Sequence, residues 1–522
     1  MGFRTTKESA LLAARQAPGE RAASRQPGHG VAVGVLTFLV AAAYSGFALA
    51  LYHTFVTSSY DLVIFDQAVR SYAHFQPGIS IIKGVHNGFG PHFSILGDHW
   101  SPILAALAPL YWIYNGPQAL LLAQAVLFAL AIPPLWVFTR RAFGGGNKAT
   151  VAAYLVSVAY ALSWPIASAL AFDFHEVAFV PVLTVVALER LQAGRLRTAL
   201  IALAALLLVK EDMGLFVAGI GLYLAVARPR TLPRQLLVGG GLMVAGVAAT
   251  FIATYVLIPA MGGRAGYYWA YSDLGSNVPQ VVGHLITHPG SLRQVVTPRV
   301  KLYTVLWLFG AFCFLPLRSP MALAAIPLLL ERMLANIFPG WWGTSLQYNA
   351  FLVMLLACAA VDGAARLDRS RLARRLKVGG TWTVALGGAA AMCAVAVVLV
   401  PHFAFGPALH PAFYQRDANA RAAAAADAVV PAGVTVAAVD NLGPQLSARD
   451  TVLLWDGDGS TPPLGTPWVV ANTAELQFTF RSVREQRQRV ALLERSGYKV
   501  VFRRLGYIVL HRGGPATGTA RG

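Results

Sequence analysis

Long apolar runs alternate with short basic segments over most of this 522-residue chain. A run of roughly 20 apolar residues is long enough to cross the hydrocarbon core of a bilayer as a helix. The pattern therefore predicts a mainly α-helical bundle that crosses a membrane many times. Full spans are predicted near 31–52, 118–138, 149–168, 177–191, 236–259, 302–317, 320–334, 347–361 and 380–400.

Two further apolar segments do not fit a simple crossing. Segment 102–114 is short, and we expect it to form a helix that lies on the outer surface. Segment 199–227 carries charged residues at its middle and arginines on both flanks, so we expect a hairpin of two half-helices. Its charged tip would stop inside the protein. With both half-helices counted, the sequence predicts about eleven membrane segments.

Composition and charge distribution support this interpretation and predict the orientation of the chain in the membrane. Hydrophobic residues make up 56% of the chain and charged residues 12%, and the net charge is +19. The basic residues are dispersed between spans rather than gathered in one patch, which indicates membrane orientation and not nucleic-acid binding. The positive-inside rule predicts a multi-pass membrane protein with its N-terminus and the 362–377 loop in the cytoplasm.

The composition changes near residue 401, where a less apolar C-terminal region begins. Helices are predicted over 414–429 and 482–496, and strands over 434–439, 451–455, 467–471, 498–503 and 506–511. We therefore expect a small extracytoplasmic α/β domain. The predicted division is a basic cytoplasmic tail (1–30), a transmembrane domain (31–400) with a large first outer loop (52–117), the α/β domain (401–512) and a flexible tail (513–522).

Two carboxylates in the first outer loop are candidate catalytic residues. Asp61 and Asp66 are five residues apart and interleaved with apolar side chains. On a helix they would point roughly 140° apart, so we expect one to face a substrate and the other the protein interior. The alternative is that both serve as helix caps or as ion-pair partners of Arg70.

Two other polar clusters are predicted on the same side and are candidates for substrate binding. Asp98, His99 and Trp100 combine an acid, an imidazole and an aromatic ring that together could bind a sugar, although a tryptophan at this place is more often a membrane-interface anchor than a stacking platform. The second cluster is Asp173, His175 and Glu176. No tight metal-ligand spacing is present, so no cofactor is required. A divalent cation is left as an alternative, with Asp61, His99, Asp173 and His175 as its ligands.

The tip of the predicted hairpin supplies three more substrate-binding candidates, Lys210, Glu211 and Asp212. A buried ammonium requires an anion. For Lys210 this anion is either a neighbouring carboxylate, Glu211 or Asp212, or the phosphate of a lipid drawn into the cavity.

Several short motifs resemble those of a family of uncharacterised predicted bacterial membrane proteins. The resemblance covers nearly the whole chain, but the family has no established activity to transfer. The motifs are Tyr60-Asp61-Leu62 with Ile64-Phe65-Asp66-Gln67, His99-Trp100-Ser101-Pro102-Ile103, Pro109-Leu110-Tyr111, Phe172-Asp173-Phe174-His175, Lys210-Glu211-Asp212 and Asn441-Leu442-Gly443-Pro444-Gln445-Leu446-Ser447.

The order of these parts is also similar to that of the GT-C superfamily of integral-membrane glycosyltransferases, which includes the protein O-mannosyltransferases and the lipid A aminoarabinose transferase. In that superfamily an acidic residue follows the first span, as Asp61 does here. A surface helix and a basic pair then follow, which 102–114 and Arg140-Arg141 match. The sequence departs from the superfamily in two places: Leu62 replaces the second acid of an Asp-Glu pair, and Glu211-Asp212 replace small residues after Lys210.

The resemblance implies a glycosyltransferase that moves a sugar from a polyprenyl-phosphate donor to a glycan, lipid or protein acceptor on the outer face. It implies that Asp61, or as second choice Asp66, is the catalytic base, and that Lys210 lies near the donor phosphate. The alternative is a non-catalytic membrane protein, either a lipid or glycan carrier or an envelope-assembly scaffold.

The predicted topology can be tested by cysteine labelling in intact cells. Single cysteines are introduced into a variant that lacks Cys313, Cys358 and Cys393. A membrane-impermeant thiol reagent should label positions in 52–101 and beyond 410. It should label the 362–377 loop only after the membrane has been opened. Labelling of that loop in intact cells would invert the topology.

Overall fold

The computed structural model describes residues 27–227, 234–369, 384–456 and 465–513. Most of the predicted N-terminal tail, part of the 362–377 loop and nearly all of the 513–522 tail lie outside the described residues.

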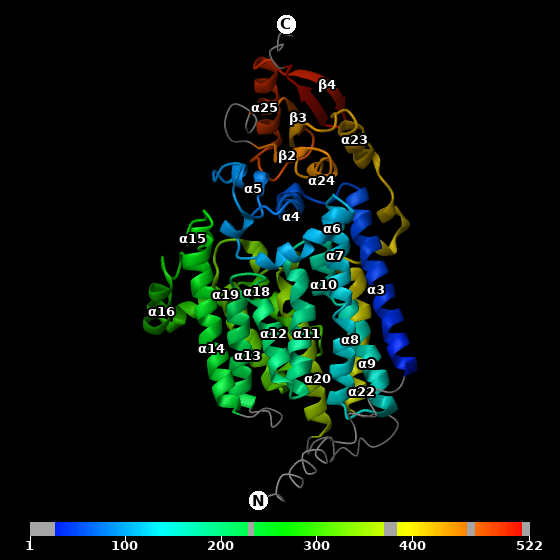
Figure 1. Ribbon diagram of the computed structural model, residues 1–522, viewed down its shortest axis with the longest axis vertical. Coiled ribbons are helices and arrows are strands. Elements are labelled where there is room, and N and C mark those ends of the chain that lie inside the picture. Colours follow the sequence, from blue (N-terminus) through cyan, green and yellow to red (C-terminus); the bar gives the residue numbers. More distant parts are fainter. Residues whose placement is uncertain (1–26, 228–233, 370–383, 457–464, 514–522) are drawn as a thin grey trace, which may run out of the picture.

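A bundle of helices forms the larger part of the molecule, and its members run along the long axis (Figure 1). They comprise α3 (Pro27–His53), α7 (Gln118–Ala129), α8 (Ile132–Ala142), α9 (Gly146–Ala161), α10 (Trp164–Ala171), α11 (Phe179–Gln192), α12 (Leu196–Leu206), α13 (Met213–Ala227), α14 (Gln235–Ile252), α18 (Arg299–Gly310), α19 (Ile326–Leu334), α20 (Ala350–Asp368) and α22 (Val384–Leu399).

Six helical stretches within the described residues are long and apolar enough to cross a membrane. They are Gly28–His53, Gln118–Ala142, Gly146–Ala171, Gln235–Ala260, Gln347–Asp368 and Val384–His402. The predicted hairpin is present as α12 and α13, both of which are shorter. The predicted span 302–317 ends early, at Gly310, and is followed by Cys313 and Phe314 with positive φ. The total of about eleven membrane segments and their orientation therefore stay predictions.

Helices α13 and α14 approach each other closely along a seam of glycines. A Cβ on Gly246 would lie 2.3 Å from the carbonyl oxygen of Gly214, and one on Gly239 would lie 2.7 Å from that of Gly221. Two neighbouring glycines of α14, Gly240 and Gly241, face open space. Small residues thus allow these two backbones to approach each other, as is usual where helices pack inside a membrane.

A layer of short helices separates the bundle from the C-terminal domain (Figure 1). It contains the helical turn η1 (Ser59–Val63), α4 (Ile64–Ala73) and α5 (Ile81–His86). The segment predicted as a surface helix forms a 3-10 turn (Pro102–Leu107) followed by α6 (Ala108–Ile113). Four more short helices lie between α14 and α18 or in the C-terminal region: α15 (Ile258–Ala260), α16 (Val278–Thr287), α17 (Pro289–Val296) and α24 (Gly443–Leu446).

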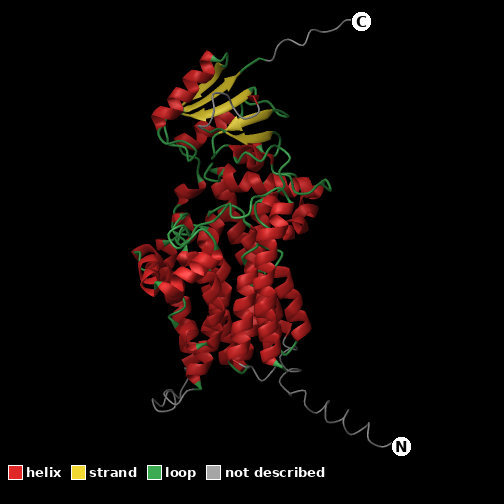
Figure 2. Cartoon of the chain, turned by 90° about the vertical axis from the view of Figure 1, so that its left-hand side faces the viewer, coloured by secondary structure: helices red, strands yellow, loops and turns green. Residues whose placement is uncertain are grey.

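The C-terminal region is a small α/β unit with a five-stranded sheet (Figure 2). The strands β1 (Thr435–Ala438), β2 (Thr451–Leu454), β3 (Trp468–Asn472), β4 (Lys499–Arg504) and β5 (Tyr507–His511) each begin within one residue of the predicted position. Their order is β2-β1-β3-β5-β4, with β1 parallel to β2 and β3 and with β5 antiparallel to both β3 and β4. Helix α25 (Val483–Arg495) matches its prediction, whereas α23 (Ala418–Asp427) begins later because Asp417 caps it by accepting from Ala420 N.

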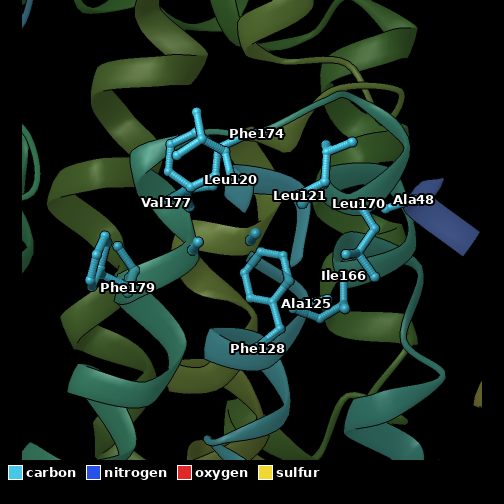
Figure 3. Close-up of a cluster of buried hydrophobic side chains, with 14 of the residues drawn as sticks. Ala48, Leu120, Leu121, Ala125, Phe128, Ile166, Leu170, Phe174, Val177 and Phe179 are labelled. Atoms are coloured by element: carbon cyan, nitrogen blue, oxygen red, sulfur yellow. The ribbon is translucent and has the colours of Figure 1, made fainter. Parts of the chain in front are cut away.

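The apolar core of the bundle fixes the loop that follows α10. Phe174 is fully buried and lies beside Leu120 of α7, with Val177 close to both (Figure 3). Because Phe174 is anchored in this way, its neighbours Asp173 and His175 are held at the end of the bundle next to the α/β domain.

The glycine seam generates a stability prediction. Gly246→Ala places a methyl group against the Gly214 carbonyl, so the helices must separate, at a cost of about 1–3 kcal/mol. The melting temperature of the purified protein in detergent should fall. Gly241→Ala is the matched control: its methyl group meets open space and alanine favours a helix, so its melting temperature should be unchanged or higher. Equal melting temperatures for the two variants would contradict close packing at this seam.

Candidate functional site

Asp61 and Lys210 are connected through one short segment, His175-Glu176. His175 Nε2 lies 3.5 Å from Asp61 Oδ1, and Lys210 Nζ lies 3.4 Å from Glu176 Oε1. The side chains of His175, Glu176 and Lys210 are each less than 10% exposed, whereas that of Asp61 is 26% exposed. The first outer loop, the loop after α10 and the tip of the α12–α13 hairpin therefore meet, although they are far apart in the sequence.

The loop after α10 is shaped by Asp173. This residue adopts a positive φ of 52°, a conformation that aspartate tolerates better than most residues. Its carboxylate accepts hydrogen bonds from Ser58 N at 2.8 Å and from Ser58 Oγ at 2.6 Å. Burial raises the pKa of Asp173 to about 7. Asp173 therefore ties this loop to the segment just before Asp61.

Asp66 is fully buried and points away from this junction. Its carboxylate accepts from Tyr111 Oη at 2.7 Å and from Ser447 Oγ, and it pairs with Arg70 at 2.8 Å. Both oxygens thus bond to other parts of the protein. This placement argues against the expected catalytic role of Asp66 and agrees with the alternative in which Arg70 is its ion partner.

The hairpin tip pairs differently from the expectation. The closest carboxylate to Lys210 is Glu176, not Glu211 or Asp212. Glu211 instead bonds to the 98–101 segment: its two oxygens contact His99 Nδ1 at 2.7 Å and Trp100 N at 3.0 Å. The hairpin tip and the predicted cluster of Asp98, His99 and Trp100 are thus brought together. Trp100 takes part in this contact through its backbone amide.

A second buried ion pair holds Asp98 and was missed by sequence reasoning. Lys83 Nζ lies 3.1 Å from Asp98 Oδ2 and donates to Tyr60 Oη at 3.2 Å and to Tyr268 Oη at 2.9 Å. Burial alone would lower the pKa of Lys83, but the carboxylate of Asp98 raises it overall. The aromatic run Tyr267-Tyr268-Trp269 could have indicated this site, since aromatic rings in a predicted loop pack against other parts of the protein.

Two adjoining cavities lie beside the hairpin tip. The smaller, about 50 Å³, is lined by Lys210, Arg332 and the carboxylates of Glu211, Asp212 and Glu331. The larger, about 410 Å³, shares Glu211, Tyr268, Glu331 and Trp341 with it. The larger cavity is also lined by Val247 and Phe251 of α14, which are 56% and 59% exposed, so it reaches the apolar surface of the bundle.

Asp61 does not line either of these two cavities, and the residues that join it to Lys210 are packed side chains. Of the expected metal ligands, Asp61 and His175 lie 3.5 Å apart, whereas His99 pairs with Glu211 and Asp173 bonds to Ser58. Within the described ranges, no three His, Cys, Asp or Glu side chains form a group that could hold a metal ion.

The sequence model of the family described as "Predicted membrane protein (DUF2079)" matches residues 51–509. The chain belongs to this family. Among curated proteins, none matches this member in sequence.

Solved structures show the fold that this DUF2079 member shares. ArnT from Cupriavidus metallidurans bound to undecaprenyl phosphate aligns with a TM-score of 0.52 and 14% identity, over 94% of this chain and 100% of that one. The apo state of the same protein gives 0.49 and 14%, over 93% and 100%. The apo oligosaccharyltransferase of Archaeoglobus fulgidus gives 0.37 and 13%, over 84% and 69%. At 14% identity, the first of these shows a GT-C-like fold and not an activity.

The pKa of Asp173 generates a pH prediction. Asp173 lies outside the apolar stretch Gly146–Ala171, and its pKa rises from 3.8 to about 7. The folded state therefore binds this proton more tightly than the unfolded state. The stability that the protonated carboxyl contributes is fully present below about pH 4 and is lost as pH rises through 7, a change on the order of 4 kcal/mol.

Melting curves between pH 5 and pH 8 check this expectation. Relative to Asp173→Asn, which does not titrate at this position, the wild-type protein should lose thermal stability as pH rises. Parallel pH profiles for the two proteins would show that Asp173 does not titrate in this window.

Proposed function

We propose that this membrane protein is a GT-C-type glycosyltransferase of the bacterial cytoplasmic membrane. It would move a sugar from a polyprenyl-phosphate donor to a glycan, lipid or protein acceptor on the outer face. The observation that carries the proposal is the charged cavity lined by Lys210 and Arg332, which adjoins a cavity reaching the apolar surface, in a fold similar to that of ArnT bound to undecaprenyl phosphate.

The larger cavity suits the lipid part of such a donor. The side chains that the helical stretch Gln235–Ala260 contributes to it include Val247, Phe251 and Tyr255, and these are exposed at the surface of the bundle. A polyprenyl chain could enter from the membrane along this helix and bury its apolar surface there. Its phosphate would then lie near the charged end of the cavity.

The charged end offers groups for both the phosphate and the sugar. Lys210 and Arg332 line the smaller cavity and would stabilise the phosphate as it leaves. Asp212 Oδ1 and Glu331 Oε2 are buried and have no hydrogen-bond partner among the residues that the structure describes. Buried acceptors of this kind are satisfied by hydroxyl donors, which a sugar ring supplies.

Asp61 is the proposed general base. Of the two predicted catalytic carboxylates it is the exposed one, and His175 holds one of its oxygens. It would take the proton from the acceptor hydroxyl while the acceptor oxygen bonds to the anomeric carbon. The bond between that carbon and the phosphate oxygen breaks, and the polyprenyl phosphate leaves with its electron pair.

The assignment of Asp61 is tested with membranes from producing cells and a panel of undecaprenyl-phosphate-linked hexoses and pentoses. Release of undecaprenyl phosphate that depends on the wild-type protein should fall about 10²–10⁴-fold in Asp61→Asn, since that is the usual contribution of a general base. Asp273→Asn is the control, because Asp273 is an exposed outer-loop carboxylate.

Undecaprenyl phosphate binding, measured by native mass spectrometry, separates the alternatives. Asp61→Asn should bind the lipid as the wild-type protein does. Wild-type binding without transfer from any donor would favour the non-catalytic carrier. Full transfer by Asp61→Asn would remove this residue from its assigned role.

A further inference from the structure

The α/β domain docks directly onto the segment that carries Asp61. The docking element is the loop Val439–Ser447, which follows β1 and includes the motif from Asn441 to Ser447 noted in the sequence. It lies at the carboxyl ends of the parallel strands, the edge at which open α/β sheets usually bind ligands. Here that edge contacts the layer of short helices that lies between the sheet and the bundle (Figure 1).

Asp440 satisfies the first donors of the turn Ser59–Val63, in which Asp61 is the third residue. Its carbonyl oxygen accepts from Ser59 N at 2.7 Å and from Ser59 Oγ at 2.6 Å. Its carboxylate accepts from Tyr60 N at 2.9 Å. Because the backbone at Tyr60 and Asp61 is not helical, the two amides that bond to Asp440 need acceptors from outside the turn, and Asp440 acts as a cap supplied by another domain.

Other contacts of the α/β domain hold the chain on both sides of this turn. Before it, Gln445 Nε2 donates to Tyr52 O at 2.7 Å. After it, Ser447 Oγ donates to Asp66, and Gln67 Nε2 donates to Val452 O at 2.9 Å. The turn with Asp61 is therefore fixed at its start and on both flanks by the domain.

The contact between Gly443 and Ser59 leaves no space for a side chain. A Cβ on Gly443 would lie 2.0 Å from Ser59 Oγ and 3.0 Å from a methyl carbon of Val452. Glycine at this position thus lets the loop of the α/β domain approach the turn closely.

We propose that the α/β domain is a positioning device for Asp61, in which Asp440 is the positioning residue and Gly443 permits the contact. The proposal rests on the proposed role of Asp61 as base. The direction of a side chain follows from its backbone, and a displacement of about 1 Å at a reacting group can cost 10²-fold in rate. A turn whose cap is lost would move in this way, whereas the capped turn holds the carboxylate in place.

Hydrogen–deuterium exchange of the full-length protein in detergent tests the contact without any substrate. In Asp440→Ala the amide of Tyr60 loses its side-chain acceptor and should exchange at least tenfold faster than in the wild-type protein, whereas the backbone carbonyl that accepts from Ser59 N remains. In Gly443→Ala, whose methyl group pushes the loop away from Ser59, the amides of both Ser59 and Tyr60 should exchange at least tenfold faster. Asp440→Asn keeps an acceptor oxygen for Tyr60 N, so its exchange should stay close to wild type. Gly513→Ala, which meets open space just after β5, is the control. Protection of β1 and β5 amides shows that the sheet is still folded.

Transfer by the same variants, measured with the undecaprenyl-phosphate-linked sugars, tests the consequence. In Asp440→Ala, kcat should fall at least tenfold with little change in the KM for the donor, and Asp440→Asn should restore it. Unchanged exchange in both alanine variants would overturn the proposal, as would faster exchange with full transfer. If the alanine variants exchange faster but the wild-type protein transfers no sugar, the glycosyltransferase function is refuted and the cap is confirmed.

Discussion

The end of the bundle next to the α/β domain depends on one constraint: a polar group buried away from water must find its partner inside the protein. Several of those partners come from another part of the chain. Lys210 of the hairpin tip pairs with Glu176 from the loop after α10, and Glu211 bonds to the 98–101 segment. Asp66 joins α4, α6 and the α/β domain. The bonds that satisfy these groups also determine which loops meet.

The apolar pattern was sufficient to predict the elements whose formation is local. The helices α7 and α8 and the five strands follow from runs of apolar residues. The span 302–317 was predicted too long, because an apolar sequence does not show that Cys313 and Phe314 turn out of the helix. Hydropathy records composition, and a reversal of the backbone at two apolar residues leaves it unchanged.

The candidate site was predictable as a set of residues but not as a set of pairs. The sequence indicated that Asp61, His175, Glu176 and Lys210 belong together, because ionisable groups next to apolar spans are costly. For Lys210 it offered a neighbouring carboxylate, Glu211 or Asp212, or a lipid phosphate, whereas the carboxylate that pairs with Lys210 is Glu176, which is not adjacent in sequence. It also missed Lys83, whose partners Asp98 and Tyr268 lie in two different loops. Pairing over such distances is decided by tertiary structure.

The cap on the Asp61 turn also fixes an order of events during biogenesis. Ser59 and the residue that caps it, Asp440, are separated by 381 positions. Chains are made from the N-terminus, and domains generally fold as units in that direction. The turn therefore lacks its cap while the bundle is synthesised. It reaches its final geometry only after the α/β domain has folded. A chain that is truncated or stalled before residue 440 would contain the helical bundle but not a finished site.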